Sequence, residues 1–224
     1  MKNIFIFLLF LPLFADITIP NTTKQLLVVH SVDFNRSKAI MQAYEYKSTQ
    51  WLKVFEPISV NLGKNGLAWG RGVLSLQKYK SLILKKEGDN KAPAGLFSLD
   101  LFFAYEEQDF NFPFLRLQKE HICVDDSNSK YYNKIITTKN KDIYKSYENM
   151  RRKDNLYELG IVVGHNKRAY PKGGSCIFIH IQRDENSPTA GCTSMEKEKL
   201  LMLMKWLDYT QHPMLLQGVN ATWH

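Results

Sequence analysis

The sequence predicts a mainly β protein with one domain, and three observations favour this fold class. Of the 224 residues, 44% are hydrophobic and 12% aromatic, a globular composition that can bury a core. Short β-branched and aromatic runs recur between polar turns, whereas a convincing helix is expected in one segment only, residues 196–209. The chain has no internal repeat, low-complexity linker or sharp change in composition. We therefore expect a single domain over residues 16–224.

Residues 1–15 are typical of a secretory signal peptide. Lys2 precedes an apolar run over residues 4–15, which is too short to span a bilayer. Cleavage after Ala15 would start the mature protein near Asp16. A hydrophobic first strand and a short membrane anchor are the alternatives. We expect export to the periplasm or cell envelope.

The first half of the chain is rich in strands that suit an antiparallel meander. The expected segments are, in chain order, a strand at 25–32, a polar turn at 33–37, strands at 39–46 and 51–60, and loops at 61–66 and 69–72. A further turn lies within residues 87–97, because Pro93 pre-sets its own φ and Gly95 permits unusual φ values.

The second half contains the segments closest to the candidate site. The expected elements are a weakly indicated helix within 141–154, strands at 160–164 and 175–181, the helix at 196–209, and a last strand at 214–217. Because side chains of a strand alternate between its faces, residues 175–181 separate into two sets. These are Ile177, Ile179 and Ile181 on one face, and Cys176, Phe178 and His180 on the other.

Cys192 is expected just before a helix N-terminus. Thr193 and Glu196 match a capping box with Thr193 as the N-cap, and Leu200 is the first residue of an apolar helical face. Unpaired N–H groups and the helix dipole at such an end lower the pKa of a thiol. Gly191 permits close approach of a substrate, and its N–H and that of Cys192 are candidates for holding an oxyanion. The sequence thus offers Cys192 as a nucleophile and His180 as its base.

Three alternatives compete with this hypothesis. A zinc site of His165, Cys176, His180 and Cys192 is disfavoured, because Cys176 and His180 would lie roughly 13 Å apart along a strand. Cys192 as a small buried hydrophobe beside a core His180 stays open, since buried free cysteines are common. Papain-like enzymes have the opposite order of cysteine and histidine, and caspase-like enzymes have the histidine much farther upstream.

The net charge limits the classes of partner that the sequence favours. The net charge is +8, spread along the chain without a basic stripe interleaved with aromatics, which argues against nucleic acid. A basic surface of this kind suits binding to an anionic wall polymer or a membrane surface, and equally it is a solvated surface without a partner.

The three cysteines leave their pairing open. Cys123 and Cys176 could pair and leave Cys192 free, but the sequence does not show that they do.

At this point two stretches resemble the L,D-transpeptidase catalytic domain of the ErfK/YbiS/YkuD type. One runs from Ser175 through His180 and on to Thr189-Ala190-Gly191-Cys192 and Met195, and the other is the turn from Glu87 to Phe97. The stretches 123–126, 164–166 and 173–175 are similar to one exported subgroup. The resemblance spans about residues 26–217.

The resemblance implies a β-sandwich or mixed sheet with a few peripheral α-helices, acting on peptidoglycan stem peptides as a monomer without metal or organic cofactor. Cys192 would form an acyl-enzyme, His180 would move the proton, and the carbonyl of Ile181 would orient the imidazole. Thr189 would order the loop. Arg183, Lys91 and His165 are further candidates for contacting the substrate, and exposed loop charges or a hydrogen-bonded loop histidine are their alternatives.

The sequence departs from the family pattern at two positions in this stretch. Ala190 stands where a second histidine is common, and Ile181 stands where glycine follows the catalytic histidine. The loop between His180 and Cys192 is also shorter than in many members. These departures keep two alternatives to a transpeptidase open. One is an L,D-carboxypeptidase that uses water as acceptor, and the other is a non-catalytic wall-binding module.

Overall fold

The computed structural model describes residues 17–74, 83–220 and 223. Residues 1–15, the expected signal peptide, lie outside the described residues. The described chain is mainly β, as predicted. Its strands are β1 (Gln25–Ser31), β2 (Lys38–Lys47), β3 (Gln50–Lys53), β4 (Ile58–Asn61), β5 (Leu67–Trp69), β6 (Ala92–Ala104), β7 (Phe114–Arg116), β8 (His121–Val124), β9 (Lys134–Thr137), β10 (Glu148–Asn149), β11 (Leu159–Val163), β12 (Phe178–Ile181), β13 (Thr193–Met195) and β14 (Met214–Val219).

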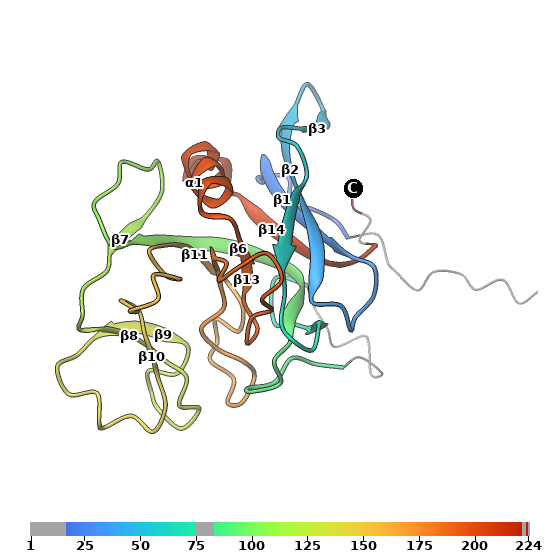
Figure 1. Ribbon diagram of the computed structural model, residues 1–224. Helices are drawn as coiled ribbons and strands as arrows, with labels where there is room; N and C mark the ends of the chain where they lie inside the picture. The colour runs from blue at the N-terminus through green and yellow to red at the C-terminus, as the bar shows by residue number, and fades with distance from the viewer. Residues whose placement is uncertain (1–16, 75–82, 221–222, 224) are drawn as a thin grey trace, which may run out of the picture.

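Eight of these strands close into a barrel rather than forming the two sheets of a sandwich. The pairing runs β1-β14-β6-β11-β12-β13-β4-β2, and β2 pairs back with β1. The ring closes because β1 is parallel to β14 on one side and antiparallel to β2 on the other. Closure leaves these strands without free edges. β3, β5 and β7 extend the same sheet beyond the ring. β3 and β7 are labelled in Figure 1.

A single α-helix is found in the described chain, α1 (Lys197–Trp206), followed by a short 3₁₀ turn at Tyr209–Gln211. The helix packs on β11 and β12. It buries Leu200, Leu203 and Met204 in the main core, which explains the apolar spacing seen in the sequence. No helix of the described ranges is long and apolar enough to cross a membrane.

A second, three-stranded sheet with the order β10-β8-β9 lies beside the barrel, away from β1, β2 and β3 (Figure 1). A disulfide joins Cys123 of β8 to Cys176, just before β12. This confirms the pairing considered from the sequence and leaves Cys192 as a free thiol. A separate apolar cluster, which includes Phe103, Cys123 and Phe178, joins the small sheet to residues of the barrel strands.

Four expected elements differ from the structure, and the fourth is the strand predicted at 175–181. The strand predicted at 51–60 is interrupted between β3 and β4, where Pro57 lacks a backbone donor, although both parts pair with β2 as a meander requires. The helix weakly indicated within 141–154 is wrong: this segment holds turns and β10, whose Glu148 pairs with Cys123. The helix predicted at 196–209 is real but shorter, since Leu207 is already extended.

The strand predicted at 175–181 is regular only from Phe178. Cys176 has a left-handed φ of 54°, and its N–H donates to Asn133 Oδ1 at 2.9 Å, so the chain turns there instead of continuing a ladder. The predicted alternation of faces is confirmed. Ile177 and Ile179 belong to the main core, whereas Cys176 and Phe178 belong to the cluster under the small sheet.

Candidate active site

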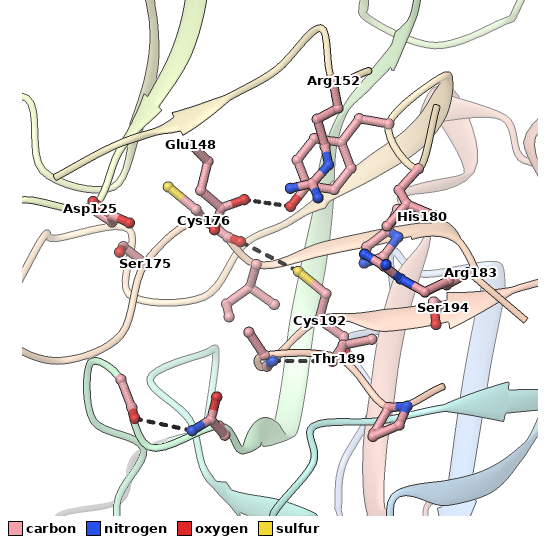
Figure 2. Close-up of a pocket in the computed structure, with 18 of the residues that line it drawn as sticks. Asp125, Glu148, Arg152, Ser175, Cys176, His180, Arg183, Thr189, Cys192 and Ser194 are labelled. Atoms are coloured by element: carbon pink, nitrogen blue, oxygen red, sulfur yellow. Dashed lines mark hydrogen bonds between the residues drawn. The ribbon is translucent and has the colours of Figure 1, made fainter. Parts of the chain in front are cut away.

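The two candidate catalytic residues come from adjacent parallel strands. In the register of β12 and β13, His180 lies opposite Ser194, and Cys192 directly precedes β13. Cys192 is therefore a diagonal neighbour of His180, about 8 Å away between Cα atoms, given ~3.3 Å per residue and ~4.8 Å between strands. Both residues line one cavity of about 390 Å³ (Figure 2).

This cavity lies on the outer face of the barrel strands. The alternate residues Ile179 and Met195 belong to the main core, so His180, Cys192 and Ser194 face the other way. From the small sheet and the segment after it, Asp125, Glu148 and Arg152 supply further wall (Figure 2). The site is thus a cleft between two sheets that the disulfide joins.

The predicted capping box is wrong. Thr193 is in β13, and its hydroxyl donates to Gln217 Oε1 at 2.8 Å instead of capping a helix. The helix begins at Lys197 with Glu196 as N-cap and no side-chain capping bond. Because Cys192 is five residues before the first helical residue, the helix terminus does not stabilise a thiolate there.

The environment of Cys192 instead favours the neutral thiol. Its side chain is 7% exposed; Sγ accepts from the Phe178 N–H at 3.3 Å and donates to the Cys176 carbonyl at 3.5 Å (Figure 2). Burial, with a smaller contribution from Glu148, raises the pKa of Cys192 to about 12. The Phe178 N–H and the cations Lys85 and Arg152 oppose this shift. The expectation of a lowered thiol pKa is therefore corrected.

His180 is held as a neutral base. Its Nδ1 lies 2.8 Å from the carbonyl of Ile181, and because a carbonyl only accepts, Nδ1 carries the proton. Burial lowers the pKa of His180 to about 4. At neutral pH the ring is uncharged, with Nε2 as an acceptor. The sequence-based expectation that Ile181 orients the imidazole through its carbonyl agrees with this geometry.

The loop before Cys192 is ordered by Thr189, as expected. The Thr189 hydroxyl donates to the Cys192 carbonyl at 2.6 Å and accepts from the Gly191 N–H at 3.0 Å. The Gly191 N–H is therefore already engaged, which leaves the Cys192 N–H as the oxyanion donor of the expected pair. Gly191 has a φ of +151°, and a Cβ there would lie 3.1 Å from the Lys91 carbonyl. The glycine therefore allows its backbone to pack closely against the segment that contains Lys91, whereas the sequence suggested a close approach to substrate.

The three other candidate residues are separated by the fold. Arg183 lines the cavity; its side chain is 65% exposed, and it lies 3.5 Å from Asp154. His165 does not line it: its Nδ1 accepts from the Arg71 N–H and its Nε2 donates to the Gly173 carbonyl, which makes it a buried loop histidine. Lys91 does not line it either, and its Nζ donates to the Asn65 carbonyl.

Sequence reasoning missed the charged wall of the cavity. Lys85 is 3% exposed and pairs with Asp89, and Glu148 bonds the hydroxyl of Tyr157. The Tyr157 ring packs edge-on against His180, with 5.2 Å between ring centroids. The Arg152 guanidinium lies over the Tyr157 ring, 5.0 Å from the ring centroid. The one local signal for a buried Lys85 was Asp89, four residues later in the turn at 87–97, because a buried lysine needs a carboxylate partner.

These residues bring a thiol, a neutral imidazole and a backbone N–H donor into one cleft, the parts that acyl transfer through a thioester needs. Among the described residues, no group of three or more His, Cys, Asp or Glu side chains is arranged to hold a metal ion. No protein-family model, curated protein or solved structure matches this chain.

Proposed function

We propose that this chain is a cysteine acyltransferase of the L,D-transpeptidase kind, which acts on peptidoglycan stem peptides in the cell envelope. One observation carries the proposal. Cys192 and His180 project from adjacent parallel strands into the same cavity, and the Ile181 carbonyl fixes the imidazole tautomer that leaves Nε2 able to accept a proton. The resemblance of the surrounding residues to L,D-transpeptidases supplies the substrate class.

In the first half-reaction, Cys192 Sγ attacks the carbonyl carbon of an L,D-configured peptide bond. The thiol proton passes to His180 Nε2, and the Cys192 N–H stabilises the oxyanion of the tetrahedral intermediate. Collapse of this intermediate expels the D-amino acid, whose nitrogen takes the proton from His180. The product is a thioester on Cys192.

In the second half-reaction, an amine or water attacks the thioester carbonyl. His180 takes the proton of the incoming nucleophile, the C–S bond breaks, and the proton returns to Cys192. An amine gives a crosslink, and water gives a shortened stem peptide. Because the resting pair is a neutral thiol and a neutral imidazole, we expect proton transfer to accompany attack rather than to precede substrate binding.

Two features support an envelope location. The Cys123–Cys176 disulfide is the kind of bond that persists outside the cytoplasm. The net charge of +8 suits an anionic wall polymer.

The test is mass spectrometry of defined tetrapeptide muropeptides after incubation with residues 16–224, beside the Cys192→Ala and His180→Asn variants. Crosslinked dimers from the wild type only would support transpeptidation, and tripeptides without dimers would identify an L,D-carboxypeptidase. His212→Asn, which changes an exposed histidine, is the matched control and should behave as wild type. Equal turnover by wild type and Cys192→Ala would refute the assignment.

The second candidate is a non-catalytic wall-binding module. It is favoured by the hydrogen bond of Cys192 Sγ to the Cys176 carbonyl and by the raised pKa of the thiol. This candidate predicts no turnover and equal binding of wild type and Cys192→Ala to isolated wall sacculi, measured by co-sedimentation.

A further inference from the structure

A row of buried polar side chains crosses three neighbouring strands beside the proposed base. His180 of β12 lies opposite Ser194 of β13, and Ser194 lies opposite Asn61 of β4. Residues opposite one another in a sheet share a face, so all three project from the outer face of the barrel. They are 6%, 1% and 1% exposed, respectively.

The hydrogen-bonding capacity of this row is only partly used. Asn61 Nδ2 reaches across β13 to Gln182 Oε1 at 3.3 Å and to the Asp184 carbonyl at 3.2 Å. Asn61 Oδ1 is buried without a hydrogen-bond partner in the described chain. The hydroxyl of Ser194 makes no hydrogen bond with any other described residue, and Ser194 lines the cavity (Figure 2). A serine with 1% exposure that faces a cavity in this way needs a polar partner from it.

We propose that Ser194 binds the incoming nucleophile of the second half-reaction. This inference rests on the proposed function. The ligand is an amine or water. Each has an N–H or O–H group that donates a hydrogen bond and a lone pair that attacks the acyl carbon. Ser194 and His180 Nε2 lie on one face of adjacent strands, so together they hold such a nucleophile beside the thioester on Cys192.

The chemistry of the step follows from this placement. The Ser194 oxygen, which faces the cavity, accepts a hydrogen bond from one N–H or O–H of the nucleophile, while His180 Nε2 accepts the proton that is transferred. The bond from nitrogen or oxygen to the acyl carbon forms, the C–S bond breaks, and the Cys192 sulfur takes the proton back from His180. The first half-reaction does not use Ser194.

The experiment separates the two half-reactions. Wild type and Ser194→Ala are mixed with a tetrapeptide muropeptide, with and without a tripeptide that carries a free side-chain amine. Acylation is followed by the burst of released D-amino acid, and deacylation by the decay of the acyl-enzyme in intact-protein mass spectra. Ser59→Ala, the same change at an exposed position of β4, is the matched control.

For Ser194→Ala we expect an unchanged burst and a deacylation rate at least tenfold lower, in both arms, so that the acyl-enzyme accumulates. Deacylation within twofold of wild type would overturn the assignment to Ser194. Equal losses in acylation and deacylation would also overturn it, because they indicate a structural role. If the wild type forms no adduct at Cys192, the proposed function itself fails, and this outcome is distinct from the other two.

Discussion

The ionisation of Cys192 is the property that the structure predicts most sharply. Burial raises the pKa of the thiol from 9.0 to about 12. Three pKa units correspond to about 4 kcal/mol of preference for the neutral thiol. At pH 8 the thiolate fraction would be about 10⁻⁴, against about 10⁻¹ for an exposed thiol with a pKa of 9.0. This is a difference of about a thousandfold in the reactive species.

Alkylation by iodoacetamide measures this difference, because Cys192 is the one free cysteine when the disulfide is intact. We expect the logarithm of the alkylation rate to rise with pH from 7 to 10 without a plateau. Limited access to the buried thiol lowers the rate equally at every pH, so the shape of the profile reports ionisation alone.

Glu148 provides the variant that tests the cause. Its carboxylate raises the pKa of the Cys192 thiol, so Glu148→Gln should alkylate faster than wild type at each pH. Glu158→Gln removes the same charge from a residue that pairs with Lys197 on the surface, and it should match wild type. A plateau with its midpoint below pH 8 in the wild type would show a preformed thiolate–imidazolium pair and refute this reasoning.

Three further predictions concern stability. His180 has a folded pKa of about 4 against 6.5 unfolded, so the unfolded chain binds more protons between these values. As pH falls from 6.5 to 4, His180 should account for a loss of up to about 3 kcal/mol, besides that of His165, whose pKa burial also lowers to about 4; His180→Asn should therefore lose less stability than wild type in urea titrations. Reduction of Cys123–Cys176, 53 residues apart, should cost roughly 4 kcal/mol in the same assay. Gly160→Ala should cost about 1–3 kcal/mol by calorimetry, because its Cβ would lie 2.1 Å from the buried Phe103 ring; an unchanged melting temperature would contradict this.

The sequence was most informative where the signal is local. Alternation of apolar residues along 175–181 placed Ile179 and Phe178 on opposite faces, and the structure confirms it. The same local signal placed His180 at the end of a strand. The strand at 214–217 and the helix within 196–209 were likewise found from short-range patterns.

Local signals also misled where tertiary pairing decided the outcome. Thr193 and Glu196 match a capping box, yet parallel pairing with β12 draws Thr193 into a strand and starts the helix at Lys197. The segment 141–154 contributes β10, because its Glu148 pairs with Cys123 of β8. Such pairings join residues distant in sequence, and no periodicity within one segment reports them.

The sequence by itself determined that a cysteine behind a glycine and a histidine at a strand end lie in one short stretch of a mainly β chain. Only the tertiary structure decided that the barrel closes, that the small sheet covers Cys192, and that Lys85, Glu148 and Arg152 surround it. The physical reason is that desolvation and charge act through space. The pKa of Cys192 depends on groups as far as 107 positions away in the chain, at Lys85, and on a fold that removes the thiol from water.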